Sequence, residues 1–355
     1  MKLVTQKIIN IYFAITKTCN LRCSYCYLLH QFRTEKIDED KILKSLYDLI
    51  QKFERENYQF GSFCFHGAEP AMMSAESLAD AVVMLNGHWK KNNDTIHQTA
   101  IQSNGTLFTD DYLDIIELKL NSNKMLKLGF SIDPPREIHN KFRNNSYKLV
   151  YDNYLNSIDR GFPVGVLSVV TSETLNNLDG FRYWMINELE RKKGNNNPYK
   201  IKIKFASGEY SLNNKQFVEF AVFLSDNSLL HLCQIFTPGY CIQSGNECFW
   251  LELDTDGSCY SCNKSYHENG IFADWKKESY ENIINRRKQL YLNLCRNPEC
   301  DSCSYEIICN SGCPIDRQPA GIDKGKAHEC SLIKTAMIEL DKRNINFVEF
   351  LNGNI

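Results

Sequence analysis

The sequence predicts an α/β protein in two parts: a parallel sheet of six strand–helix units, then a loop-rich region dense in cysteine. The first observation is that short β-rich apolar runs alternate with longer helical patterns over about the first two hundred residues, which is typical of parallel βα units with right-handed crossovers. The second is the uneven placement of the 15 cysteines. Three lie at positions 19 to 26, one is Cys64, and eleven lie between Cys233 and Cys330.

Each strand is expected from an apolar run that ends at a polar turn, and each helix from apolar residues spaced three and four apart. Strands are expected at 11–16, 61–66, 99–102, 126–132, 164–170 and 201–205. Helices are expected at 38–55, 74–89, 110–120, 148–160, 178–191 and 215–232, with Ser74 as an N-cap. The second part should contain a hairpin at 249–260 and a last helix at 331–343. Polar loops beyond the carboxyl ends of the strands are where such sheets carry function.

Composition and charge exclude several classes of protein. With 355 residues, 43% of them hydrophobic, the chain is long enough for one large and one smaller domain. The net charge is −2 and the sequence has no long basic run, so it lacks the basic surface that is typical of proteins that bind nucleic acid. No apolar run approaches the roughly 18 residues of a transmembrane helix, and no signal-peptide cleavage site is visible. We therefore expect a cytoplasmic protein that binds neither nucleic acid nor membrane, with cysteines that hold metal rather than form disulfides.

Three cysteines directly follow the first predicted strand, in the pattern Cys19-x3-Cys23-x2-Cys26. Thiolates at this spacing can ligate three of the four irons of a cubane cluster. The missing fourth ligand leaves one metal position open, as catalytic sites require and closed structural sites do not. A zinc knuckle is the alternative from spacing alone. The position at a strand end and the aromatic Tyr25 beside the last cysteine favour a catalytic cluster.

Residues 18–27, Thr-Cys-Asn-Leu-Arg-Cys-Ser-Tyr-Cys-Tyr, resemble the signature of the radical S-adenosylmethionine (AdoMet) superfamily. The resemblance covers nearly the whole chain and extends to the members with a C-terminal SPASM domain, which are anaerobic sulfatase maturases and peptide maturases. It implies an enzyme that cleaves AdoMet to a 5′-deoxyadenosyl radical. It also implies a partial (β/α)6 TIM-type barrel at 1–210, a helical bridge at 211–240, and a SPASM domain with two auxiliary iron–sulfur clusters at 241–355.

The ends of the second and third strands resemble motifs with which the family binds AdoMet. Phe-His-Gly-Ala-Glu-Pro at 65–70 stands where the family has Gly-Gly-Glu-Pro, with Ala68 in place of the second glycine. There the backbone at Gly67 would approach the methionyl amino group, and Glu69 would accept its hydrogen bond. Gln102 and Asn104 lie in Gln-Ser-Asn-Gly, which resembles the family's Gln-Thr-Asn-Gly.

The fourth strand end completes the expected AdoMet-binding set. Ser-Ile-Asp at 131–133, with His139 and Arg143 downstream, resembles the family's Ser-Ile-Asp-Gly-Pro stretch, although Pro134 replaces the glycine. Ser131 is the expected ribose contact, and Asp133, Arg143 and Tyr25 are expected to line the same pocket. For Arg143, an exposed structural position is the alternative.

The C-terminal cysteines match the spacing of the SPASM domain: seven of them and Gly257 fit the pattern. Following the family, one auxiliary cluster would be held by Cys241, Cys248, Cys262 and Cys313, and the other by Cys300, Cys303, Cys309 and Cys330. With the N-terminal cluster, this makes three [4Fe–4S] clusters. Zinc is the alternative from spacing alone. No role is assigned to the remaining cysteines, which are Cys64, Cys233, Cys259 and Cys295. Of these, Cys64 is expected to be a small buried hydrophobic residue.

Two departures from the sulfatase maturases favour a peptide maturase. Sulfatase maturases usually carry Gln before Gly-Gly-Glu-Pro and, after the cysteine that closes the first auxiliary-cluster motif, an Asp that acts as general base. This chain has His66 and Asn263 at those positions, and a neutral amide cannot take a proton as a carboxylate does. We predict that the enzyme crosslinks a ribosomally made precursor peptide, with sulfatase maturation as the alternative. His66 is a candidate catalytic residue that orients substrate or moves a proton, or else a structural histidine.

The expected partners follow from this prediction. They are the precursor peptide and a reducing protein of the flavodoxin or ferredoxin type. Because Cys19 comes so early, we expect no N-terminal leader-binding domain, which many peptide maturases have. A different class, an electron-transfer or zinc-scaffold protein without AdoMet chemistry, is the remaining alternative; it assigns no role to Glu69 or Ser131.

Overall fold

The structure is a computed structural model of the chain. It describes residues 7–28, 36–91, 98–121, 126–194, 201–236, 250–262, 265–266, 268–294, 296–317, 321, 324–327 and 329–343. Four residues named above, Cys241, Cys248, Asn263 and Cys295, lie outside these ranges.

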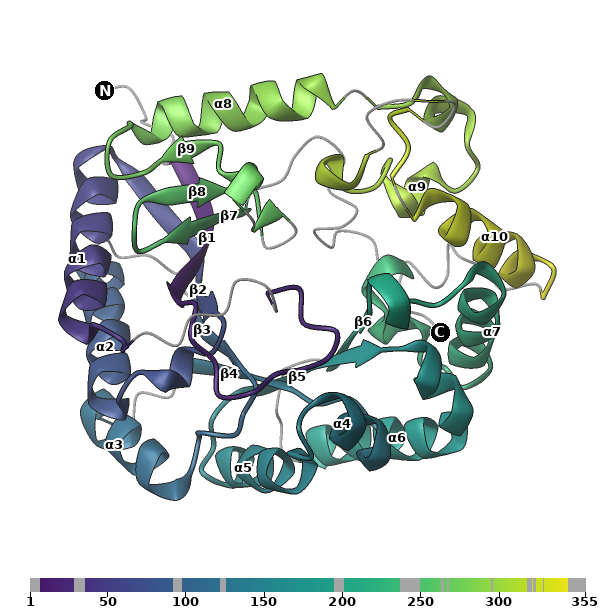
Figure 1. The fold of residues 1–355 in the computed structure, drawn as a ribbon, viewed down its shortest axis with the longest axis horizontal. Coiled ribbons are helices and arrows are strands. Elements are labelled where there is room, and N and C mark those ends of the chain that lie inside the picture. The colour runs from purple at the N-terminus through teal and green to yellow at the C-terminus, as the bar shows by residue number, and fades with distance from the viewer. Residues whose placement is uncertain are drawn as a thin grey trace.

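A single curved sheet organises the molecule (Figure 1). Its first six strands are β1 (Lys7–Thr16), β2 (Tyr58–Gly67), β3 (Gln98–Ser103), β4 (Leu126–Ser131), β5 (Val164–Val170) and β6 (Ile201–Phe205). Each pairs with the next in parallel, so all their carboxyl ends reach the same rim. The strands stand side by side in chain order and the sheet does not close on itself. The predicted partial barrel of six parallel strands is therefore confirmed.

Seven helices follow these strands and cover the outer side of the curve in Figure 1. They are α1 (Glu39–Arg55), α2 (Ala75–Lys91), α3 (Asp110–Leu120), α4 (Arg136–Phe142), α5 (Tyr147–Asp159), α6 (Leu178–Gly194) and α7 (Asn214–Asp226). All but α4 were predicted. The Ser74 hydroxyl accepts from the Ser77 N–H at 3.3 Å, so Ser74 caps α2 as expected. The predicted helix 215–232 ends early because Ser228 has a positive φ of 57°, and a separate 3-10 turn covers Leu230–Leu232.

Alternation along the strands separates an apolar outer face from a polar inner face. In β4, for example, Leu128 and Phe130 are fully buried in the main hydrophobic core, whereas Gly129 and Ser131 are only partly buried. In β2, Phe63 and Phe65 join the same core. The core therefore lies between sheet and helices, and the inner face is left for polar side chains.

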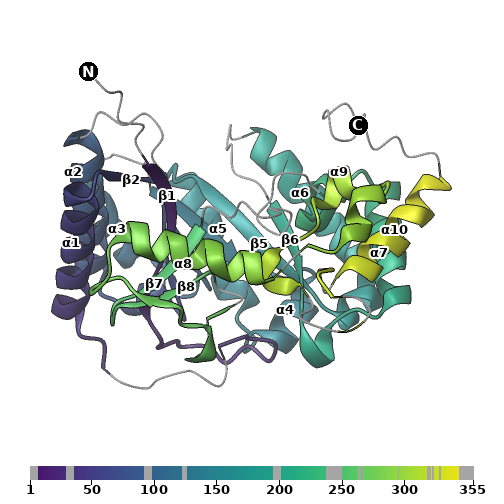
Figure 2. The same ribbon diagram turned by 90° about the horizontal axis from the view of Figure 1, so that it is seen from above.

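The C-terminal part continues the same sheet. Strand β7 (Trp250–Asp254) pairs in parallel with β1, and β8 (Ser258–Tyr260) and β9 (Ala273–Asp274) follow antiparallel. The expected hairpin turning at Asp256-Gly257 is thus confirmed over its described residues. Helix α8 (Tyr280–Asn293) crosses the front of the molecule in Figure 2, and α9 (Glu306–Cys309) leads to α10 (Cys330–Asp341), which packs on α7.

Short 3-10 turns complete the described structure at Pro70–Met72, Ser172–Asn177, Gly208–Tyr210, Leu230–Leu232, Gln234–Phe236, Glu268–Gly270, Pro298–Ser302 and Pro314–Asp316. None of the described helices is both long enough and apolar enough to span a membrane.

We predict that Leu128→Ala lowers the free energy of unfolding by about 2–5 kcal/mol, because it empties space in a close-packed core. Leu118→Ala is the matched control: Leu118 lies in α3 with 78% of its surface exposed, and its truncation should change stability by about 0.5 kcal/mol or less. Urea denaturation followed by tryptophan fluorescence measures both. Equal effects of the two substitutions would contradict the placement of the core.

Candidate active site

The cysteine loop that follows β1 lies on the inner side of the curved sheet (Figure 1). Helix α4 holds it from one end. The Ser24 N–H donates to the carbonyl of Phe142 at 3.1 Å, and the Arg22 N–H donates to Oδ1 of Asn144, just past α4, at 2.8 Å. The unpredicted helix α4 therefore positions the three cysteines over the strand ends.

N–H groups point at all three sulfurs, and the donor at the sulfur of Cys26 is the backbone N–H of Leu28. The Leu21 N–H lies 3.4 Å and Nδ2 of Asn104 lies 3.8 Å from Sγ of Cys19, while Arg143 approaches Sγ of Cys23 at 3.9 Å. Burial raises the pKa of the Cys19 thiol to about 11, and the two donors oppose that rise. Donors of this kind stabilise thiolate, the form that ligates a metal.

The donor set fits an iron–sulfur cluster with one open position. Cys19, Cys23 and Cys26 come from one loop, and the charges of neighbouring members act on each other. In the described part of the chain, no three His, Cys, Asp or Glu side chains close on a single metal ion. A cubane cluster does not require three side chains to meet at one ion, because each thiolate binds a different iron.

The loop after β2 runs alongside the segment that leads into Cys19. The Ala68 N–H donates to the carbonyl of Thr16 at 2.8 Å, and the Glu69 N–H donates to the carbonyl of Thr18 at 3.1 Å. Gly67 has a φ of +119°, and a Cβ there would lie 2.5 Å from the Thr16 carbonyl oxygen. Only glycine therefore allows this close approach.

The Glu69 carboxylate joins the ends of β2 and β3. It is fully buried and accepts from the Ala71 N–H at 2.9 Å, the Ser103 hydroxyl at 2.7 Å and the Asn104 N–H at 2.6 Å. Burial raises the pKa of Glu69, and these three donors oppose the rise. Each carboxylate oxygen can accept more than one bond, so the expected contact with a methionyl amino group would add to this internal role.

Three amides and two hydroxyls continue the polar rim formed by the strand ends. Nδ2 of Asn104 donates to Oδ1 of Asn20 in the cysteine loop at 2.8 Å, and Asn20 in turn donates to the Thr106 hydroxyl at 2.7 Å. Gln102 donates through Nε2 to the Ser131 hydroxyl at 3.2 Å. The structure thus brings the expected residues of β3 and β4 together beside the cysteine loop.

Asp133 ties the fourth and fifth strands to the cysteine loop. Its Oδ1 accepts from the Val169 N–H at 2.7 Å, and its Oδ2 accepts from Nε of Arg143 at 2.6 Å and from the Tyr25 hydroxyl. The Arg143 guanidinium also lies 5.3 Å from the centre of the Tyr25 ring. Arg143 is 7% exposed, so the alternative of an exposed arginine is wrong.

The four cysteines expected to hold the second auxiliary cluster lie close together. Burial, followed by the charges of Cys330, Cys300 and Cys303, raises the pKa of the Cys309 thiol to about 12. Of the other expected set, Cys313 is buried and Cys262 lies just past β8. Its two remaining members fall outside the described residues. The unassigned Cys64, Cys233 and Cys259 are buried, as expected for Cys64.

The structure adds one residue that the sequence analysis missed. Glu252 lies in the middle of β7, pairs with Tyr12 of β1, and is fully buried on the inner face. Nδ1 of His66 lies 3.5 Å from its Oε1. The sequence does contain a signal, an acidic residue inside the apolar run Trp-Leu-Glu-Leu. Its place beside His66 could not be predicted, because β7 and β1 are distant in the sequence.

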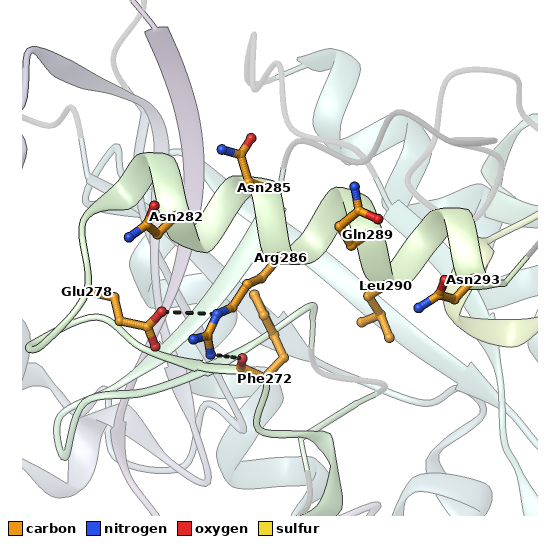
Figure 3. Close-up of a pocket in the computed structure, with 8 residues that line it drawn as sticks. All are labelled: Phe272, Glu278, Asn282, Asn285, Arg286, Gln289, Leu290 and Asn293. Atoms are coloured by element: carbon orange, nitrogen blue, oxygen red, sulfur yellow. Dashed lines mark hydrogen bonds and ion pairs between the residues drawn. The ribbon is translucent and has the colours of Figure 1, made fainter.

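A groove on the outer surface belongs to none of these sites. It runs along α8, where Asn282, Gln289 and Leu290 line it and Arg286 bonds both Glu278 and the carbonyl of Phe272 (Figure 3). None of the expected site residues lines it.

We predict that Arg143→Gln lowers the free energy of unfolding by about 3 kcal/mol, because it leaves the buried Asp133 carboxylate without its cation. Arg182→Gln is the control: this half-exposed arginine faces Asp179 at 3.6 Å, so its loss should cost about 0.5 kcal/mol or less. Chemical denaturation compares the two. An Arg143 variant as stable as the control would refute the structural role of the Asp133 contacts.

The comparisons with known proteins agree on one family. Residues 13–182 match the model of the radical SAM superfamily. The chain is 21% identical over 336 residues to the cysteine-type anaerobic sulfatase-maturating enzyme of Clostridium novyi (strain NT), covering 86% of this chain and 87% of the relative. It is 25% identical over 333 residues to the enzyme of the same name from Clostridium perfringens (strain ATCC 13124), covering 83% and 85%.

Solved structures share the fold. That of native anSMEcpe with bound AdoMet and Cp18Cys peptide superposes with a TM-score of 0.74 at 19% identity, covering 98% of this chain and 99% of that one. That of Streptococcus suis SuiB bound to precursor peptide SuiA gives a TM-score of 0.63 at 11% identity, covering 87% and 72%. With a radical SAM domain over the cysteine loop and strand ends, this chain is a radical SAM enzyme, homologous to the anaerobic sulfatase-maturating enzymes.

Proposed function

We propose that this enzyme modifies a peptide, abstracting hydrogen from one residue of a ribosomally made precursor and leaving a crosslink, either a carbon–carbon bond or a thioether. The observation that carries the proposal is the polar rim of strand ends gathered against the cysteine loop. Solved structures of the same fold hold peptides, namely Cp18Cys in anSMEcpe and SuiA in SuiB, which supports a peptide as the substrate class.

Different residues of the rim would hold different parts of the cluster and AdoMet. When bound, the cluster and AdoMet supply a 5′-deoxyadenosyl radical. Cys19, Cys23 and Cys26 would hold the cluster, and Asn104 and Arg143 would donate hydrogen bonds to its thiolates. The backbone at 67–69 and the Glu69 carboxylate would fix the methionyl group, and the Ser131 hydroxyl would meet the ribose, in a pocket completed by Tyr25, Ala68, Gln102 and Asp133. Fixed positions favour one hydrogen of the substrate over others.

Sulfatase maturation is the second candidate, and the full-length match to sulfatase-maturating enzymes favours it. Two positions favour crosslinking instead. This chain has His66 where those enzymes usually have Gln, and Asn263 where they have the Asp that acts as base. Both candidates remove a second hydrogen as a proton and an electron, so both need a proton acceptor.

Two auxiliary clusters are part of the proposal. The proximity of Cys300, Cys303, Cys309 and Cys330 supports one of them. The other would use Cys241, Cys248, Cys262 and Cys313. A cluster near the substrate can accept the electron that the substrate radical gives up, and a flavodoxin or ferredoxin would supply the electron that starts each turnover.

We predict that Cys23→Ala abolishes 5′-deoxyadenosine formation in enzyme reconstituted anaerobically with iron, sulfide, dithionite and AdoMet, because one cluster ligand is lost. Cys233→Ala is the control: Cys233 is fully buried in the main hydrophobic core, away from the cysteine loop, and its variant should retain the reaction. Chromatography of the nucleoside products measures both. Continued 5′-deoxyadenosine formation by the Cys23 variant would contradict the assignment of Cys23 as a cluster ligand, and the absence of 5′-deoxyadenosine with wild-type enzyme would favour the electron-transfer or zinc-scaffold alternative.

The two peptide reactions leave different masses. We predict that reconstituted enzyme with AdoMet removes two hydrogen atoms from a short precursor peptide encoded beside its gene, and leaves a cysteine-containing sulfatase peptide unchanged. Mass spectrometry of both peptides decides. Loss of two hydrogen atoms together with replacement of the cysteine sulfur by oxygen in the sulfatase peptide would instead establish sulfatase maturation.

A further inference from the structure

Glu252 is a buried carboxylate that the fold does not satisfy. It lies on β7 with none of its surface exposed, and within the described part of the chain neither carboxylate oxygen has a hydrogen-bond partner. A buried charge without donors costs several kcal/mol. A residue that is kept at such a cost is a candidate for function rather than for stability.

Asp254, two residues along the same strand, provides the contrast. Both side chains point to the inner face because strand residues alternate. Asp254 is fully engaged: its Oδ2 faces Lys17 Nζ at 3.1 Å and accepts from the Tyr266 hydroxyl at 2.8 Å, and its Oδ1 accepts from the Thr255 hydroxyl at 3.2 Å. The fold therefore satisfies one acid of β7 and leaves the other unsatisfied.

His66 is the one basic side chain within ion-pair distance of Glu252 among the described residues. Its Nδ1 lies 3.5 Å from Oε1 and makes no hydrogen bond to any residue that the structure describes. It follows Phe65 at the carboxyl end of β2, directly before the Gly67 loop, and its ring packs 5.6 Å from that of Tyr12. The imidazole keeps 13% of its side chain exposed, whereas the Glu252 side chain has no exposed surface.

The pair lies between the cysteine loop and the C-terminal cysteines. Burial, followed by the charges of Glu252, Cys26 and Cys262, raises the pKa of the Tyr27 phenol well above its usual value. Tyr27 nevertheless keeps 47% of its surface accessible. Tyr27, next to the proposed cluster ligand Cys26, is therefore close to Glu252.

The other groups that act on Glu252 do not neutralise it. They are the thiol of Cys64 and the phenols of Tyr27, Tyr260 and Tyr266. The nearby cation Lys17 is paired with Asp254. An imidazolium at position 66 is thus the positive charge that this carboxylate is placed to stabilise.

We propose that His66 is the proton acceptor of the peptide modification and that Glu252 is its positioning residue. This inference rests on the proposed function. The adenosyl radical would take one hydrogen atom from a substrate carbon and become 5′-deoxyadenosine. The resulting carbon radical would form the crosslink bond to a sulfur or carbon of a second substrate residue. The hydrogen on that atom would leave as one electron, which goes to an iron–sulfur cluster of the enzyme, and one proton, which goes to Nε2 of His66. Glu252 stabilises the imidazolium through Nδ1, which takes over the role that Asn263 cannot perform.

The test uses holoenzyme and a perdeuterated precursor peptide, so that abstraction and proton loss are read separately. Glu252→Gln should still transfer deuterium to 5′-deoxyadenosine at close to the wild-type rate, while product formation falls by about a hundredfold. His66→Gln should behave in the same way, and the double variant should be no worse than His66→Gln, since the two residues act as a unit. Glu252→Asp should restore part of the product.

Measurements of thermal stability distinguish a positioning role of Glu252 from a purely structural role. Because Glu252 has no donors to lose, Glu252→Gln should melt no lower than wild type. The exposed exchange Glu219→Gln is the control and should change neither the melting temperature nor the ratio of product to 5′-deoxyadenosine. A Glu252→Gln enzyme with the wild-type ratio, or one in which abstraction and product fall together, overturns the inference. Wild-type enzyme that transfers no deuterium from the peptide overturns the proposed function itself.

Discussion

The contacts of the Asp133 carboxylate hold the site together. One oxygen accepts from the backbone of β5, and the other accepts from Arg143 and Tyr25. Arg143 follows α4, and Tyr25 stands between Cys23 and Cys26. The carboxylate therefore fixes the cysteine loop against two strand ends at once. Charge-assisted bonds in a buried position hold a geometry more firmly than neutral bonds at a surface.

Stability and chemistry are assigned to opposite faces of the same sheet. The outer face packs apolar strand residues against the helices, so the polar inner face and rim need contribute little to burial of apolar surface. The rim can then hold groups such as Glu252 that destabilise the fold locally. The C-terminal part takes part in this arrangement, because β7 pairs with β1 and brings its acidic residues to the same interior.

Local patterns predicted the parallel sheet and most of the rim. The cysteine loop, Glu69, Asn104 and Asp133 are each next to a strand end in the sequence, so their meeting follows from parallel pairing alone. Helix α4 was not predicted, because its seven residues after Pro134-Pro135 are too few to show a helical period. The position of β7 beside β1, and with it the Glu252–His66 pair, depends on pairing between segments about 240 residues apart, which no local periodicity encodes.

The central claim is that Cys19, Cys23 and Cys26 hold a cluster with one iron open to AdoMet. Electron–nuclear double resonance of the reduced enzyme with AdoMet labelled at the methionyl nitrogen tests this most directly. The account predicts a hyperfine coupling from the labelled nitrogen to the cluster, present in wild type and absent in Cys23→Ala. A reduced N-terminal cluster that shows no such coupling in wild-type enzyme would contradict it.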